Sequence, residues 1–320
     1  MRARVRSRPR TRQRPEHGEA VPAFVVAVDR GRYSCRTPDG LDVTAMRARE
    51  LGRRAVVVGD NVQIVGDVSG DADSLARIVR VDERRSVLRR TADDDDPIER
   101  VVVANAEQLV IVTALADPPP RARLIDRCLV AAYDAHLDPL LCLTKSDLAD
   151  PNDLLAAYAP LGVPAVVTGR DYLDDAVASL RERLADRVSV LVGHSGVGKS
   201  TLVNRLVPDA DRATGAVSGV TGRGRHTSSS VVALALPGGG WIVDTPGIRS
   251  FGLAHVAPET VLAAFPDLAP AAANCRAGCT HAAGEPGCAL DAHVAAGHAD
   301  PVRLDSLRRL LAARDRTPDD

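Results

Sequence analysis

Lysine is nearly absent from this chain of 320 residues. Lysine and arginine together number 41, and only Lys145 and Lys199 are lysines. Arginine therefore supplies positive charge wherever a generic cation is sufficient. A compact ammonium and a planar guanidinium approach phosphate groups with different geometry, so the two positions that keep lysine are expected to need it. Both lysines are therefore candidate functional residues.

Long apolar runs are also absent, and cysteines are few. No stretch approaches the ~18 consecutive apolar residues of a membrane helix, so no membrane span is expected. The basic N-terminus lacks a following apolar segment and does not resemble a secretory signal. Three of the six cysteines fall between Cys275 and Cys288, which favours one metal site in a cytoplasmic protein over a disulfide framework. The near-zero net charge and the length indicate a globular protein of two or three domains.

Residues 1–20 form an arginine-rich tail, with arginine at every even position from Arg2 to Arg14. Such a segment cannot bury a core and is expected to be disordered. Two interpretations stay open. The tail is either an electrostatic arm for nucleic-acid phosphates or a solubilising extension.

Short strands separated by turns are expected over residues 21–92, at 24–28, 33–36, 41–45, 55–58, 61–65 and 78–81. This even spacing is typical of a small closed barrel, of which the OB-fold is the commonest at this length. Barrels of this type often bind oligonucleotides by stacking bases on aromatic rings. Only Phe24 and Tyr33 are available for stacking, so a plain packing role is the alternative. The acidic run at residues 93–96 is expected to be a solvated linker.

Strand and helix patterns alternate after this linker. Strands are expected at 108–113, 140–143 and 163–167, and helices at 121–135 and 172–184. This alternation predicts a doubly wound parallel sheet. Residues 167–169, at the end of the last of these strands, are expected to offer backbone contacts to a base.

A glycine-rich loop lies between an apolar strand at residues 188–192 and a helix pattern. The loop has the form G-x-x-x-x-G-K-S, which is typical of a phosphate-binding loop in this context. Its backbone N–H groups and the helix N-terminus would bind phosphate oxygens, Lys199 would reach the β- and γ-phosphates, and Ser200 would ligate Mg²⁺. The expected nucleotide-binding residues here are Gly193, His194, Ser195, Gly196, Val197, Gly198, Lys199, Ser200 and Thr201.

The strand expected at 140–143 is followed directly by Thr144, Lys145, Ser146 and Asp147. Ligands of doubly wound sheets bind at the carboxyl ends of strands. The Asp147 carboxylate is suited to accept hydrogen bonds from N1–H and N2–H₂ of guanine, with the Lys145 stem over the base, and adenine lacks this donor pair. The usual motif begins with asparagine, so Thr144 removes a carboxamide contact.

A second strand-end motif, Asp244-Thr245-Pro246-Gly247, follows a hairpin expected at residues 231–243. Asp244 is expected to hold Mg²⁺ through water, and the Gly247 N–H to touch the γ-phosphate. The glycine- and serine-rich stretch at 213–230 occupies the place of a switch loop, in which Thr227 or Ser228 would close on Mg²⁺.

The order of these motifs is unusual, because the base-reading residues precede the phosphate loop. In ordinary GTPases the phosphate loop comes first. The same sheet forms if the chain is cut and rejoined elsewhere, since chain termini usually lie close together. The motifs therefore predict a circularly permuted P-loop GTPase that binds GTP and GDP with Mg²⁺. They also suggest that nucleotide state repositions the C-terminal region.

Four metal-binding side chains, Cys275, Cys279, His281 and Cys288, lie close together in the C-terminal segment. Three thiolates and one imidazole complete a tetrahedral Zn²⁺ site without an open position, so one structural zinc is expected. A helix is expected at 300–314. The remaining cysteines, Cys35, Cys128 and Cys142, are expected to be small apolar core residues.

Taken together, these marks resemble the ribosome-small-subunit-dependent GTPases of the RsgA type. The resemblance runs from about residue 21 to 312 and includes Gly-Arg-His-Thr at 224–227. It implies an OB-fold at 21–92, a permuted GTPase domain at 98–254 and a mostly helical zinc-binding domain at 255–320. It further implies GTP hydrolysis, stimulated by the small ribosomal subunit during late maturation, by a monomeric cytoplasmic protein that contacts rRNA.

The resemblance also points to His226 as the catalytic residue. Many GTPases orient the attacking water with a glutamine after the Asp-x-x-Gly motif, and Ile248 occupies that position here. The alternative is that His226 is a plain switch residue and the ribosome supplies the catalytic group. Two other functions stay open, namely a P-loop ATPase or kinase and an RNA-binding scaffold with a structural nucleotide.

Overall fold

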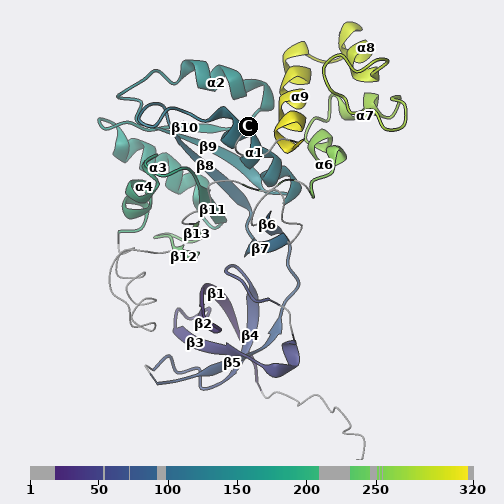
Figure 1. Cartoon of the computed structure of the whole chain (residues 1–320). Helices are drawn as coiled ribbons and strands as arrows, with labels where there is room; N and C mark the ends of the chain where they lie inside the picture. The colour runs from purple at the N-terminus through teal and green to yellow at the C-terminus, as the bar shows by residue number, and fades with distance from the viewer. Residues whose placement is uncertain are drawn as a thin grey trace, which may run out of the picture.

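The computed structural model describes residues 19–52, 55–71, 73–91, 99–208, 231–245, 251, 253 and 255–315. A barrel, a sheet flanked by helices and a group of C-terminal helices follow one another along the chain (Figure 1). Over these residues, none of the helices has the length and apolar character needed to cross a bilayer.

The N-terminal barrel has five strands, and it confirms the predicted small closed barrel. Strand β1 pairs with both β2 and β4, which closes the order β1-β2-β3-β5-β4, and β3 runs parallel to β5. This is the strand order of an OB-fold. Inward-facing side chains alternate along the strands and leave Val25, Cys35 and Ile64 without exposed surface. The strands are β1 (Val21–Asp29), β2 (Arg32–Arg36), β3 (Asp42–Arg47), β4 (Asn61–Gly66) and β5 (Ala76–Val81).

The prediction of a strand at residues 55–58 is wrong. Among the described residues of this segment, Val58 makes one isolated bridge to Val103. The Asp60 carboxylate accepts the Val57 N–H at 2.8 Å, and Gly59 has φ +91° against the Ala104 carbonyl. A turn capped by the Asp60 side chain therefore replaces the predicted strand pairing, because the aspartate gives the backbone a local hydrogen-bond partner.

A two-stranded antiparallel sheet, β6 (Val87–Thr91) and β7 (Glu99–Ala104), links the barrel to the larger sheet. The sequence pattern had not indicated either strand. Leu88 and Val103 are buried in the same core as the helix-flanked sheet. The pairing joins segments on either side of the acidic run at 93–96, which lies outside the described residues.

The larger sheet has the order β10-β9-β8-β11-β13-β12, parallel except for β12. This confirms the predicted parallel sheet. Every residue of β8 and β11 is buried, as expected for strands covered on both faces. The strands are β8 (Gln108–Ala114), β9 (Asp138–Thr144), β10 (Ala165–Val167), β11 (Val188–Val192), β12 (Val232–Ala235) and β13 (Trp241–Asp244).

Helices cover both faces of this sheet. Along β8, Leu109 and Ile111 face the core that contains α1, whereas Val110 and Val112 face the core that contains α3 and α4. The alternation follows from the period of two in a strand. The flanking helices are α1 (Ala122–Asp134), α2 (Asn152–Tyr158), α3 (Leu173–Leu184) and α4 (Lys199–Leu206), with a short 3₁₀ turn, η2 (Ala159–Leu161).

The C-terminal helices are α6 (Pro258–Ala263), α7 (Ala269–Ala272), α8 (Ala289–Ala295) and α9 (Pro301–Asp315). Helix α9 confirms the helix predicted at 300–314 and packs against α1. The Arg309 guanidinium pairs with the Asp126 carboxylate at 3.2 Å and lies over the Tyr158 ring. Burial raises the pKa of Asp126, although Arg309 opposes this shift. The C-terminal helices thus pack directly against the helices that cover the larger sheet.

Candidate nucleotide site and cysteine cluster

The phosphate-loop candidate has the predicted strand–loop–helix form. Strand β11 ends at Val192, and α4 begins at Lys199 after Gly198, whose φ is +92°. A Cβ at Gly193 would lie 2.4 Å from the Val112 carbonyl oxygen. Glycine is required at both positions, because side chains rarely adopt such a φ and no side chain fits against that carbonyl. Ser200 and Thr201 lie exposed in the first turn of α4.

Lys199 lies between the carboxyl ends of β11 and β13. Its Nζ atom is 2.8 Å from Asp244 Oδ1 and 3.4 Å from the Thr245 carbonyl oxygen. The two strands are paired in parallel with Leu191 opposite Asp244, so the loop at 193–200 and Asp244, the first residue of the second motif, lie at the same edge of the sheet. The Lys199 ammonium group is thus paired with Asp244, and phosphate oxygens bound at the loop would compete with this carboxylate for it.

The base-reading candidates lie at the next strand ends. The Ser146 N–H donates to the Thr168 carbonyl at 3.2 Å, and Asp147 Oδ1 accepts the Arg170 N–H at 3.1 Å. The loop after β10 therefore orients the Asp147 carboxylate. The Ser146 hydroxyl also contacts the Tyr172 hydroxyl. The sequence had indicated residues 167–169 here but not Arg170 or Tyr172.

Lys145 has a left-handed backbone conformation, with φ +60°. Its Nζ atom donates to the Asp117 carbonyl, in the loop after β8. The second retained lysine therefore connects the carboxyl ends of β8 and β9. Asp117 carries no recognisable motif, so the sequence could not have indicated this contact.

Thr144 connects the candidate base-reading segment to the phosphate-loop candidate. It is the last residue of β9, is buried, and its Oγ1 donates to the Val197 carbonyl at 2.6 Å. The Thr113 carbonyl lies at 3.4 Å from the same atom. Loss of the carboxamide was expected to cost a contact, but the hydroxyl supplies a direct contact to the phosphate loop.

We predict that Thr144→Val raises the dissociation constant for GDP and for GTP about tenfold. The substitution keeps the shape but leaves the buried Val197 carbonyl without its donor, a loss of about 1–3 kcal/mol. Titration of a fluorescent nucleotide measures the effect. Thr144→Ser, which keeps the hydroxyl, is the matched control and should bind like the wild type. Equal affinity of the valine variant would show that this contact does not support the loop.

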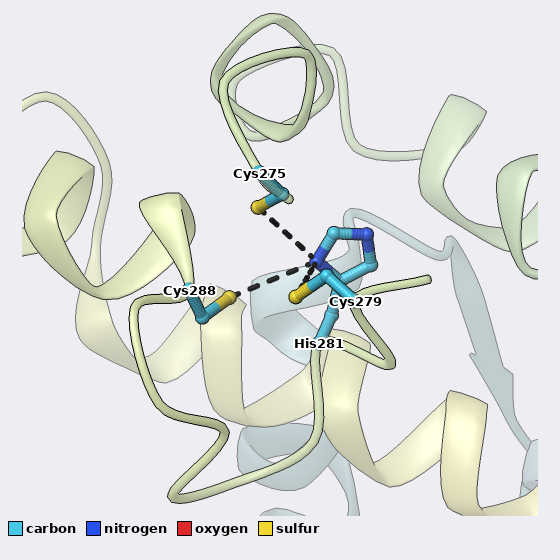
Figure 2. Close-up of side chains that lie close together, drawn as sticks. All are labelled: Cys275, Cys279, His281 and Cys288. Atoms are coloured by element: carbon cyan, nitrogen blue, oxygen red, sulfur yellow. Dashed lines mark hydrogen bonds between the residues drawn. The ribbon is translucent and has the colours of Figure 1, made fainter. Parts of the chain in front are cut away.

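The four cysteine and histidine candidates come together between α7 and α8, with Cys288 at the start of α8 (Figure 2). The Nδ1 atom of His281 lies 3.7, 3.5 and 3.7 Å from the Sγ atoms of Cys275, Cys279 and Cys288. Tetrahedral Zn²⁺ with ordinary Zn–S and Zn–N bonds separates sulfur from nitrogen by about 3.6 Å. The cluster is therefore consistent with one structural zinc.

Several candidates fall outside the described residues. These are His226, Thr227 and Gly247, together with the rest of the expected switch loop. Of the remaining loop residues, His194 places Nδ1 2.9 Å from the Ser195 carbonyl, and Gly196 has φ +84°.

The three cysteines outside the cluster, Cys35, Cys128 and Cys142, are buried. Burial raises the pKa of each thiol to about 12, as expected of core residues.

The model of one protein family, described as RsgA GTPase, matches residues 81–254. A protein of Chlorobaculum parvum named small ribosomal subunit biogenesis GTPase RsgA is 37% identical over 311 residues, covering 93% of this chain and 99% of the relative. The chain belongs to the RsgA GTPase family. A Pseudomonas aeruginosa protein with the same name is 40% identical over 270 residues, covering 82% of this chain and 77% of the relative.

Two solved structures share the fold. YjeQ from Thermotoga maritima has a TM-score of 0.69 at 24% identity, covering 93% of this chain and all of that one. YloQ, described as a circularly permuted GTPase, has a TM-score of 0.65 at 22% identity, covering 94% of this chain and 96% of that one. The RsgA fold thus confirms the permuted order predicted from the motifs. The RsgA family match contains the phosphate-loop candidate, the candidate base-reading residues and Asp244.

Proposed function

We propose that this protein is a GTP hydrolase that binds the small ribosomal subunit and assists its late maturation. The observation that carries the proposal is the hydrogen bond from Thr144 to Val197, which joins a guanine-reading segment to a phosphate loop. Both segments are present in a chain of the RsgA GTPase family. The relatives named for small-subunit biogenesis supply the expected ribosomal role.

Each end of the site has a separate task. Asp147 accepts the donors of the guanine edge, and Lys199 exchanges its Asp244 partner for the β- and γ-phosphates. Mg²⁺ would be held by the hydroxyl of Ser200, by the hydroxyl of Thr227 or Ser228, and through water by the Asp244 carboxylate, since this metal prefers oxygen ligands. When bound, Mg²⁺ neutralises charge that develops on the phosphate oxygens. Gly247 offers its N–H to the γ-phosphate.

His226 is our candidate for orienting the attacking water, since Ile248 cannot do so. The deciding experiment measures phosphate release with and without purified small subunits, for the wild type and for His226→Ala. We expect stimulation of the wild type and loss of stimulation in the variant, with unchanged GTP binding. If small subunits did not change the rate of phosphate release by the wild type, the ribosomal role would be overturned. A variant stimulated like the wild type would remove His226 from the mechanism.

Contact with rRNA is proposed for the barrel. Arg32, Met46 and Arg77 lie side by side across β2, β3 and β5, and all three are exposed. Two guanidinium groups beside an apolar side chain suit a sugar–phosphate backbone.

The protein would work in the cytoplasm. The domain boundaries expected from the sequence, 21–92, 98–254 and 255–320, remain our proposed division of the chain.

We further propose that the cysteine cluster holds one structural Zn²⁺. Elemental analysis of purified protein should give about one zinc per chain. Cys279→Ser should lose the zinc and loosen the segment between α7 and α8, because structural sites supply folding energy. GTP binding should persist, since the cluster and the phosphate loop lie on different elements. Cys35→Ala is the control and should keep its zinc. Full zinc content in Cys279→Ser would contradict the proposed ligand set.

A further inference from the structure

Strand β1 belongs to the barrel and to the GTPase sheet at once. Val25 packs in the barrel core, Val26 in the core on the α1 side, and Ala27 in the core on the α3 and α4 side. A register shift in the β1–β2 pairing between Val25 and Ala27 allows three consecutive residues to be buried in three cores. Ala27 then pairs with Val232 of β12, so barrel and sheet form a single 11-stranded sheet.

An aromatic contact strengthens this junction. The Phe24 ring stacks on the Trp241 ring with centroids 4.7 Å apart and an interplanar angle of 26°. The Arg36 guanidinium lies 5.9 Å from the centre of the Trp241 ring and is held by two 2.7 Å hydrogen bonds to Asp42. Trp241 is the first residue of β13. The barrel therefore contacts the β12–β13 hairpin at two places, along β12 and at the first residue of β13. In Figure 1 the barrel lies below the sheet, on the side of this hairpin.

Cross-strand pairs connect the barrel, through the hairpin, to the residue that contacts the phosphate-loop lysine. Ala27 of β1 is opposite Val232 of β12, and Val232 is opposite Asp244 of β13. The Asp244 carboxylate is the 2.8 Å partner of Lys199. Only one strand therefore separates the barrel from the residue that binds the phosphate-loop lysine.

We propose that Phe24 is a positioning residue of the nucleotide site, acting through Trp241 and the β12–β13 hairpin on Asp244. The inference rests on the nucleotide site of the proposed function. When the barrel packs against the hairpin, it fixes the position of the hairpin and therefore of Asp244. Asp244 acts at the end of the site that would hold the γ-phosphate. GDP has no γ-phosphate and depends less on that end. Because coupling between sites is reciprocal, the triphosphate in turn strengthens barrel docking.

Phe24→Leu tests the proposal, because it removes the ring while the β1 backbone stays paired with Arg36 of β2 and Asn61 of β4. Dissociation constants are measured for GDP and for a non-hydrolysable GTP analogue. We expect the constant for the analogue to rise at least about fivefold and that for GDP to change less than about twofold. Phe24→Tyr, which keeps the ring, and Leu75→Ala, an exposed barrel substitution outside this contact, should behave like the wild type.

The fluorescence of Trp241 gives a second measurement, because it is the only tryptophan in the chain. In the wild type, the GTP analogue should shift its emission more than GDP does. Identical emission with both nucleotides, or equal weakening of both in Phe24→Leu, would overturn the inference and leave the proposed function standing. A wild type that binds neither nucleotide would overturn both.

Discussion

Asp147→Asn should exchange guanine specificity for xanthine specificity. The structure directs Asp147 Oδ1 to the Arg170 N–H at 3.1 Å. The carbonyl oxygen of asparagine can keep this contact, which turns its NH₂ group toward the base. That NH₂ cannot accept from N1–H and N2–H₂ of guanine, but it can donate to the C2 carbonyl of xanthine.

The expected loss of GTP affinity is large, because two charge-assisted hydrogen bonds disappear. At about 1.5–3 kcal/mol each, affinity should fall at least about 100-fold. Binding of GTP, XTP and ATP is measured by competition against a labelled nucleotide. Asp153→Asn, an exposed substitution in the first turn of α2, is the control. A variant that still prefers GTP would mean that the base is bound elsewhere, and wild-type preference for ATP would point to an ATPase or kinase.

The strands with continuous apolar runs could be predicted closely from the sequence. Strand β11 has its predicted bounds, and β8 differs by one residue, because a strand buried on both faces needs an unbroken apolar run. The residues that follow such strands are placed by the topology of the sheet. Hence the sequence could predict that the two candidate segments lie at neighbouring strand ends, and the hydrogen bond from Thr144 to Val197 shows that these segments are in contact.

Contacts between distant segments could not be predicted in this way. The turn at Val57 depends on the Asp60 carboxylate, and Asp60 in turn pairs with Arg84 at 2.7 Å. The register shift that moves β1 between cores depends on where β12 lies. Neither feature appears as a period in the sequence. Asp60 caps the turn locally, but its carboxylate is also held by Arg84, which is 24 residues further along the chain, and β12 is distant from β1 in the sequence.

Lys199→Arg should reduce GTP hydrolysis at least about 100-fold, although it keeps the positive charge. Lys199 has 14% of its side chain exposed, and its single Nζ atom lies between Asp244 Oδ1 and the Thr245 carbonyl. A guanidinium is wider, planar and fixed in its donor directions, so it cannot occupy this space and also point between two phosphates. Phosphate release in the presence of small subunits, together with nucleotide affinity, measures the loss.

Arg205→Lys on the same helix is the matched exchange in the opposite direction. Arg205 is exposed and pairs with Asp174 at 3.0 Å, a surface interaction that an ammonium replaces at little cost. This variant should hydrolyse GTP at the wild-type rate. The contrast tests why a chain with only two lysines keeps one of them at this position. If Lys199→Arg hydrolysed GTP normally, the narrow space around the Lys199 Nζ atom would not be the reason that lysine is kept, and the requirement for an ammonium group would fail.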